Sequence, residues 1–283
     1  MLAGSAAAQD LTLSLSIYTD AKTGINFTNW GTPGANGAGA FNFGFVLPPD
    51  ALQKDATEYI GRLQCQSSNA STTGWCGIAH GGHMPSDLLL MVWPYNGHVY
   101  TSFRFVGDYF KPSLFGGETG SNGTSAAFPA PVLSVISTAV STAANTTANA
   151  SSSFYEIIYR CQNCWSWQQG SYNESVHTAL QPGDAESVLV LGWAQATKGP
   201  TNPACTGNGL NFGFHDSGYG QWGASLSNAT RTGYEAWTKL ATQVPNLGGS
   251  NDTAASCQAK AAPSAAPSAV PTAAARRTVK VDW

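Results

Sequence analysis

The chain has 283 residues, of which 42% are hydrophobic and 11% aromatic, so it can build one sizeable core with room for tails. Only 10% of the residues are charged and the formal net charge is −3, whereas an average soluble domain has roughly 25% charged residues. No basic cluster is present that would attract phosphates, so we expect no nucleic-acid partner. No apolar run reaches about 18 residues, so we expect no membrane-spanning helix.

We divide the chain into three parts. Residues 1–9 are Ala-rich and look like the remnant of a signal peptide, although the basic start and the apolar run of a full one are missing. Residues 10–242 are interpreted as one folded domain. Residues 243–283 have the Ala/Pro/Ser-rich composition of a disordered linker, which predicts a further module that has been truncated.

Short segments of strand character recur through the expected domain, with turn residues between them. They cover residues 42–47, 58–63, 87–93, 98–105, 154–159 and 187–194. Asn96-Gly97 between two of these runs is a strong hairpin signal, and residues 99–105 alternate like a half-buried strand. Because no long amphipathic helix appears, the pattern predicts an all-β sandwich or barrel.

A stretch rich in Gly, Ser, Thr, Ala and Asn interrupts this pattern at residues 116–153. We interpret it as a long glycosylated surface loop that could hold a strand or short helix at residues 129–140. Eight Asn-x-Ser/Thr sequons occur, at Asn26, Asn69, Asn122, Asn145, Asn149, Asn173, Asn228 and Asn251. So many sequons in a chain with so few charges favour a secreted glycoprotein.

Six cysteines agree with an oxidising, extracellular compartment. Local spacing favours the pairs Cys65–Cys76, Cys161–Cys164 and Cys205–Cys257, although sequence alone cannot select one pairing. The Cys161-x-x-Cys164 motif could instead be a redox or metal-binding pair, but no second such motif and no histidine lies near it in the sequence.

Two Gly-rich turns carry the residues with the most chemical promise. Met84 follows Gly81-Gly82, a pair that lets the backbone approach another group closely. His215 lies in an aromatic and Gly-rich segment, residues 211–223. The simpler interpretations are a gap-filling methionine and an ordinary surface or core histidine.

Other candidate sites are weaker. His80, His83 and Asp87 could suggest a metal, but on a turn their spacing fixes no shared face. No nucleophile elbow, P-loop or dinucleotide-binding motif is present. Four tryptophans could stack on sugars or could fill a sandwich core: Trp165, Trp167, Trp222 and Trp237.

Five motifs, in order along the chain, resemble the cytochrome domain of fungal cellobiose dehydrogenases and its relatives in the DOMON class. They are residues 16–27, the Trp75-x-Gly-Ile-Ala-x-Gly-Gly-x-Met84-x-x-Asp87 sequence, residues 101–112, residues 159–167 and residues 215–234. The resemblance runs through most of residues 15–240. It implies an immunoglobulin-like antiparallel β-sandwich with long surface loops.

The resemblance also implies one haem b, with Met84 and His215 as the axial ligands of the iron and Tyr109 near a haem propionate. It favours a disulfide over a metal site at Cys161 and Cys164. The haem would be held without covalent bonds, because no Cys-x-x-Cys-His motif occurs. Asp216 is a candidate hydrogen-bond partner of the ligand imidazole. The aromatic residues expected to form an apolar haem pocket are Phe103, Phe212, Phe214, Tyr219 and Trp222.

The spacing around the ligand histidine departs from the family pattern by one residue. A match without gaps from the upstream Phe212 would put Gly209 at the ligand position. We assign His215, because the match running back from Tyr234 ends within one residue of it. Otherwise the haem would have one protein ligand, His83 would substitute, or the domain would lack haem.

The resemblance implies a secreted domain that transfers single electrons as part of an oxidoreductase system, rather than a complete enzyme. Its electrons would come from an attached or separate dehydrogenase, and a flavin dehydrogenase or a transmembrane cytochrome module is the expected fused or separate partner. A copper polysaccharide monooxygenase, ferric iron or a quinone would accept the electrons. The alternative hypotheses are a haem-free carbohydrate-binding sandwich and a structural or adhesive domain of the cell wall.

Overall fold

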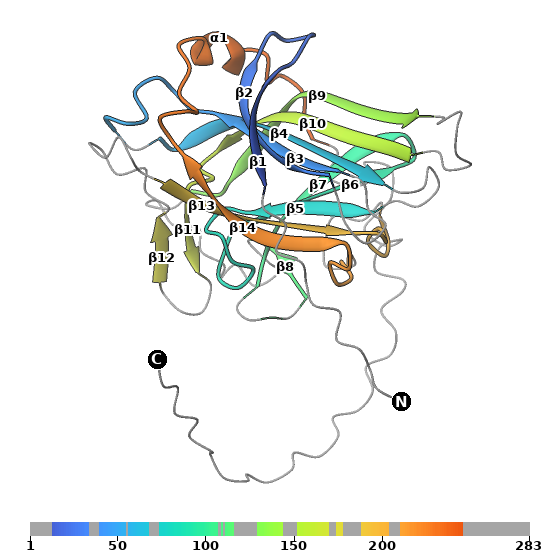
Figure 1. Ribbon diagram of the computed structural model, residues 1–283. Helices are drawn as coiled ribbons and strands as arrows, with labels where there is room; N and C mark the ends of the chain where they lie inside the picture. The colour runs from blue at the N-terminus through green and yellow to red at the C-terminus, as the bar shows by residue number, and fades with distance from the viewer. Residues whose placement is uncertain are drawn as a thin grey trace, which may run out of the picture.

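Two six-stranded antiparallel sheets pack face to face in the computed structural model (Figure 1). The structure describes residues 13–33, 40–54, 56–67, 74–106, 109, 111–115, 129–143, 152–169, 174–177, 188–203 and 210–245. The predicted antiparallel β-sandwich is therefore confirmed. Among the described residues, no helix combines the length and apolar character needed to cross a membrane.

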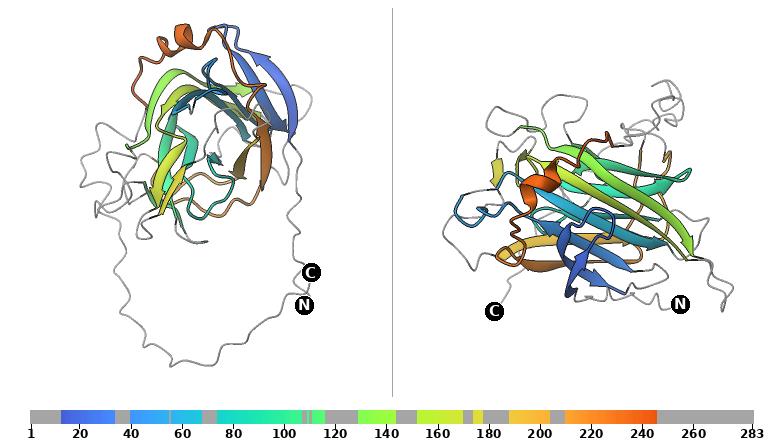
Figure 2. Two further views of the ribbon diagram at one scale, coloured as in Figure 1. Left: turned by 90° about the vertical axis from the view of Figure 1, so that its left-hand side faces the viewer. Right: turned by 90° about the horizontal axis from the view of Figure 1, so that it is seen from above.

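Neighbouring strands in each sheet are often far apart in the sequence. From edge to edge, the first sheet consists of β1 (Ser14–Thr19), β2 (Asn26–Thr32), β3 (Phe41–Val46), β4 (Glu58–Ser67), β10 (Ser152–Gln162) and β9 (Val132–Ala143). The second consists of β14 (Gly218–Ser225), β13 (Val188–Ala196), β5 (Trp75–Ala79), β6 (Leu89–Tyr95), β7 (His98–Phe105) and β8 (Ser113–Leu114). A separate ribbon pairs β11 (Ser166–Gln169) with β12 (Glu174–His177), and a short helix, α1 (Tyr234–Thr238), lies beyond the first sheet (Figure 2).

Aromatic rings fill the space between the sheets. Phe41 of the first sheet lies 5.0 Å from the Trp193 ring of the second, and Phe43 lies 5.9 Å from Trp222, measured between ring centroids. Buried aromatic rings of this size contribute much of a sandwich's stability, since each removes a large apolar area from water. The core is therefore complete between the two sheets.

The β6–β7 hairpin follows the sequence prediction. Asn96 and Gly97 form its two-residue turn with φ of 48° and 77°, the left-handed conformations that this turn requires. The prediction that β7 is half-buried was wrong, because Ser102 and Arg104 on its second face are also buried. Both faces are covered because the second sheet has packed residues on its outer side as well.

Two of the three expected disulfides are present in the described residues. Cys65–Cys76 joins β4 of the first sheet to β5 of the second, so it links the two layers covalently. Cys161–Cys164 closes the turn that follows β10. The third expected pair, Cys205–Cys257, lies outside the described residues.

Within residues 116–153, which we interpreted as a long surface loop, the strand considered for residues 129–140 is present and extends further than expected. Residues 132–143 form β9, a twelve-residue edge strand that pairs with β10, and β10 itself begins at Ser152. Gln243 forms an isolated bridge with Val135 of β9, so folded contacts reach at least to that residue.

Candidate functional site

A cavity of about 1000 Å³ opens on the outer face of the second sheet. Strands β5, β6, β13 and β14 form its floor, and three loop segments form its walls: residues 82–84, residues 109, 111 and 112, and residues 212–215. Most of the floor is apolar, with Trp75, Leu89 and Met91 among the lining residues. The cavity therefore suits a large, mainly apolar ligand.

Strand β6 shows why the sequence forms a site here. Leu90 and Val92 face the core between the sheets, whereas Leu89 and Met91 belong to a second buried cluster on the outer face. A strand of this sheet with only one covered face would alternate apolar and polar residues. The continuous apolar run from residue 88 to residue 93 is thus the sequence signal of a site on the outer face.

Met84 lies half-buried on the turn between β5 and β6 and packs against the outer-face cluster. The Gln221 side chain donates a 2.7 Å hydrogen bond to the Gly82 carbonyl, and the Trp167 indole donates a 2.9 Å bond to the Ser86 carbonyl. Gly82 and Ser86 both have left-handed backbone, with φ of 92° and 66°. These bonds from β14 and β11 hold the Met84 turn in one conformation.

Asp87 fastens the same turn from within. Its carboxylate accepts a 2.6 Å hydrogen bond from the His83 amide. Burial raises the pKa of Asp87 to about 6, and hydrogen bonds from the backbone of His83 and Gly81 lower it in part. The carboxylate therefore caps the turn.

His215 is held by aromatic rings rather than by a hydrogen-bond network. Its ring lies 4.3 Å from that of Phe214 and 4.4 Å from that of Tyr219, centroid to centroid. Its Nδ1 atom is buried and has no hydrogen-bond partner in the part of the chain that is described. Burial lowers the pKa of His215, which favours the neutral imidazole.

The expected hydrogen bond between Asp216 and the imidazole is not formed. The Asp216 carboxylate instead accepts hydrogen bonds of 2.7 Å from both the backbone amide and the hydroxyl of Thr197, at the end of β13. These bonds hold its pKa below the usual value, although partial burial acts to raise it. Asp216 therefore anchors the backbone beside His215 without touching its ring.

Tyr109 and Lys111 lie on the rim of the cavity. The Tyr109 side chain is 76% exposed, and Lys111 is exposed too. They bring a hydroxyl and an ammonium group to a cavity whose interior is apolar. Lys111 was not singled out from the sequence, and only its position two residues after Tyr109 could have indicated it.

Glycines shape the cavity floor. Gly77, Gly192, Gly213 and Gly220 all line it and offer no side chain to fill it. At Gly192 a Cβ atom would lie 2.7 Å from the Gly82 carbonyl oxygen, so the turn can lie against β13 only if this position is glycine. At Gly213 a Cβ atom would meet nothing within 4 Å, because the position borders open space.

The histidines of the Met84 turn are separated by the fold. His83 is exposed and lines the cavity, whereas His80 is fully buried between the sheets. A ring nitrogen of His80 lies within 4.8 Å of the sulfur atoms of Cys161 and Cys164, but these sulfurs are joined in a disulfide and offer no thiolate to a metal. The structure thus brings no His80–His83–Asp87 metal site together.

The expected pocket aromatics divide into two groups. Phe212, Phe214 and Tyr219 line the cavity, whereas Phe103 and Trp222 pack with the core between the sheets. Of the tryptophans considered for sugar stacking, Trp165, Trp167 and Trp222 are buried in that core, and Trp237 lies in α1 and packs against a third buried cluster. Gly209, the alternative ligand position, lies outside the described residues.

Comparison with known proteins agrees with this geometry. The family model described as the cytochrome domain of cellobiose dehydrogenase matches residues 18–236. The solved cytochrome domain of Myriococcum thermophilum cellobiose dehydrogenase superposes with a TM-score of 0.65 and 34% identity, covering 82% of this chain and 98% of that one. The cytochrome b domain of Coprinopsis cinerea pyranose dehydrogenase gives a TM-score of 0.53 at 24% identity, with the same coverage, and supports the fold.

Among curated proteins, the pyrroloquinoline quinone-dependent pyranose dehydrogenase of Coprinopsis cinerea is 26% identical over 237 residues. The match covers 83% of this chain but only 27% of that protein, so the chain spans about a quarter of the length of this relative. The family match over most of the described domain and the 34% identity to a solved member lead to one conclusion. The chain belongs to the family of cellobiose dehydrogenase cytochrome domains.

Proposed function

We propose that this domain holds one haem b in the outer-face cavity, without covalent attachment, and passes single electrons. In this proposal Met84 and His215 are the axial ligands. A haem with both axial positions filled supplies one-electron exchange and offers no open position for oxygen or substrate. The observation that carries the proposal is that a thioether and a neutral imidazole line the same apolar cavity.

The residues present fit such a group. The cavity volume of about 1000 Å³ is at the upper end of the roughly 300–1,000 Å³ typical of cofactor pockets. Its glycine and apolar floor gives a flat macrocycle a surface to lie on, and because Nδ1 of His215 is buried, Nε2 is the ring nitrogen that would face the macrocycle. Neutral imidazole and thioether are suitable donors for haem iron.

The side chains around the two proposed ligands would orient them. Phe214 and Tyr219 flank His215 and limit rotation of its ring. Tyr109 and Lys111 on the rim could hold the two carboxylates of a haem at the water-exposed edge, by a hydrogen bond and by charge. The thioether of Met84 would favour the reduced iron and raise the reduction potential.

The relatives support a proposal for the electron donor. The Myriococcum domain belongs to a cellobiose dehydrogenase and the Coprinopsis protein is named a pyranose dehydrogenase. We therefore propose a sugar-oxidising dehydrogenase, flavin- or quinone-cofactor-dependent, as the electron donor. A copper polysaccharide monooxygenase, ferric iron or a quinone would be the acceptor. Two disulfides support an extracellular setting.

An absorption spectrum of the secreted protein, as purified and after dithionite, tests the proposal. We expect a sharp Soret band, with resolved α and β bands on reduction, from low-spin haem b. Met84→Ala and His215→Ala should each lose this low-spin spectrum, whereas Met91→Leu, a change on the same cavity floor, should keep it. A protein with no Soret band even after haem is supplied would rule out electron transfer through haem, and retention on insoluble glycans would then indicate sugar binding.

A further inference from the structure

His80 lies close to Met84 in the sequence but takes no part in the cavity. It follows β5 directly, and its side chain is completely buried. Its backbone amide donates a 3.1 Å hydrogen bond to the Leu88 carbonyl, and its Nδ1 atom lies 2.8 Å from the same oxygen. A carbonyl oxygen can only accept, so Nδ1 carries the proton and Nε2 carries the lone pair.

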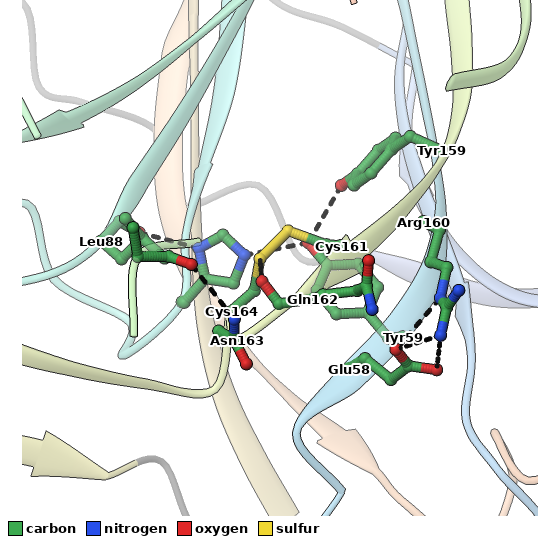
Figure 3. Close-up of a disulfide and its surroundings, with 11 residues drawn as sticks. Glu58, Tyr59, Leu88, Tyr159, Arg160, Cys161, Gln162, Asn163 and Cys164 are labelled. Carbon is green, nitrogen blue, oxygen red and sulfur yellow. Dashed lines mark hydrogen bonds and ion pairs between the residues drawn. A yellow bond between two sulfur atoms is a disulfide. The ribbon is translucent and has the colours of Figure 1, made fainter. Parts of the chain in front are cut away.

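The lone pair of Nε2 receives a hydrogen bond from the opposite sheet. The Tyr59 hydroxyl of β4 lies 2.9 Å from Nε2, and the Tyr159 hydroxyl of β10 lies 3.1 Å from that of Tyr59. Tyr59 therefore donates to His80, and Tyr159 is left to donate to Tyr59. This chain of hydrogen bonds runs in one direction, from β10 through β4 to Leu88. Figure 3 shows Tyr159, Tyr59 and Leu88 around the Cys161–Cys164 disulfide.

The surroundings keep the His80 ring neutral and fixed. Burial lowers its pKa to about 4, so the ring is uncharged at neutral pH. The Trp165 ring lies 5.5 Å away and the Tyr59 ring 5.8 Å away, centroid to centroid. A neutral ring enclosed by aromatic side chains and a disulfide has no room to rotate, so its two hydrogen bonds persist.

His80 and Leu88 are the two ends of the turn that carries Met84. Both the backbone amide and the side chain of His80 donate to the Leu88 carbonyl, so two hydrogen bonds join the two ends of the turn. Gln221 and Trp167 hold the outer part of the turn. We propose that His80 is a positioning residue that fixes where the Met84 sulfur lies, and through it the strength of the bond between sulfur and haem iron.

This inference rests on the proposed function, because it takes Met84 as an axial ligand. A turn without the side-chain bond from His80 to Leu88 would let the Met84 sulfur move away from the iron. The thioether raises the potential only while it is bound, so a loosened turn should lower the potential and admit carbon monoxide to the ferrous haem. A merely structural role in the core would change the melting temperature without these effects.

A matched pair of substitutions at His80 separates its two hydrogen bonds. The Asn amide nitrogen can replace Nδ1, so His80→Asn keeps the bond to Leu88 and loses the bond from Tyr59. In His80→Gln the amide reaches the place of Nε2 and the bond to Leu88 is lost. We expect His80→Gln to lose most of the near-infrared charge-transfer band of ferric, thioether-bound haem, to bind carbon monoxide when reduced and to have a lower potential. His80→Asn should lose only part of the band and lower the potential less, as expected of a variant that loses the bond from Tyr59 and keeps the bond to Leu88.

A second pair of variants covers the case in which the His80 variants do not fold. Tyr59→Phe removes one hydroxyl and keeps the ring, and Tyr155→Phe makes the same change at another buried tyrosine of the first sheet. Only Tyr59→Phe should lower the potential and weaken the band. Equal potentials in wild type, His80→Gln and Tyr59→Phe would overturn the role of His80, even if the melting temperatures fall. A wild-type protein without the band would refute the proposed haem ligation itself.

Discussion

The two loops that carry Met84 and His215 are built in opposite ways. The Met84 turn is held by directional hydrogen bonds from two other parts of the chain and by the His80–Leu88 bond at its base, where Leu88 is fully buried. The His215 ring itself is held by tilted and edge-on contacts with Phe214 and Tyr219, and Phe214 is 74% exposed. The proposed haem site thus has one ligand on a fixed support and one on an adaptable support. A cofactor that enters from outside would need such an adaptable side.

The largest expected effect is at Gly82, in the fixed turn. In Gly82→Ala a Cβ atom would lie 2.6 Å from the Val190 Cγ1 atom, and φ of 92° disfavours any side chain. We expect a loss of about 2–3 kcal/mol in the free energy of unfolding, measured by chemical denaturation. The same change at Gly213, in the His215 segment, should cost little, because a Cβ atom there meets nothing within 4 Å.

The double variant Gly82→Ala/Val190→Ala sharpens that comparison. Removing the Val190 methyl groups should recover the steric part of the loss and leave the part due to φ. If Gly82→Ala and Gly213→Ala are equally stable, then the Met84 turn is not the more constrained of the two loops.

The pH dependence of stability separates two buried groups of the fixed turn. The folded-state pKa of His80 is lowered to about 4, so this residue destabilises the fold as the pH falls from about 6.5 to 4. The pKa of Asp87 is raised to about 6, so its contribution is present below about pH 3.8 and is lost as the pH rises through 6. The two contributions have opposite signs in one pH range and should largely cancel in the wild type.

Replacing Asp87 should reveal the His80 contribution. In Asp87→Asn we expect the free energy of unfolding to fall by about 2–3 kcal/mol between pH 7 and pH 4.5, since a shift of one pKa unit corresponds to about 1.4 kcal/mol. The exposed Asp50→Asn serves as the control for removing a carboxylate. A flat profile in Asp87→Asn would show that His80 does not titrate as its burial requires.

A smaller effect is expected at Gln221. Gln221→Met keeps the length of the side chain but loses the 2.7 Å hydrogen bond to the buried Gly82 carbonyl. We expect a loss of about 1–2 kcal/mol in the free energy of unfolding, because the carbonyl is left without that partner. Amide hydrogen exchange of residues 81–88 should become faster, and an unchanged exchange rate would contradict the role of Gln221.

The smallest effect on stability is expected in the His215 segment. Phe214→Ala removes an exposed ring that stacks on His215, so it should cost about 0.5–1 kcal/mol or less. Haem transfer to an apo-globin acceptor should nevertheless become faster, because the imidazole loses one of its two flanking rings. Phe214→Tyr, which keeps the ring, should behave like the wild type, and equal transfer rates in all three proteins would argue against the stacking role.

Local signals predicted the parts of the fold that depend on near neighbours. The Asn96-Gly97 turn, the apolar run of β6 and the Cys161–Cys164 pair each follow from a few consecutive residues. Strand β9 was predicted only as one of two options inside a long loop, because its Ser- and Thr-rich sequence resembles a loop, and it is a strand through its pairing with β10. Amino-acid composition alone does not reveal which strand a segment will pair with.

The residues of the candidate site also differ in how far the sequence predicted them. Met84, His215 and Tyr109 were assigned by resemblance, and the fold brings all three to one cavity. His80 was missed as a support of the turn because Tyr59 and Tyr159, which complete its hydrogen-bond chain, are 21 residues before it and 79 residues after it in the sequence. Asp216 was misassigned because its carboxylate binds the amide and hydroxyl of Thr197, which is 19 residues earlier in the sequence.

The cavity lies outside the sandwich core, and this has a consequence for how the domain is made. Every aromatic contact between the sheets, and the Cys65–Cys76 bridge between them, is complete without any group in the cavity. We therefore expect folding of the sandwich and binding of the proposed haem to be separable steps. In that case the two sheets would pack and their disulfide would form before the proposed cofactor is supplied.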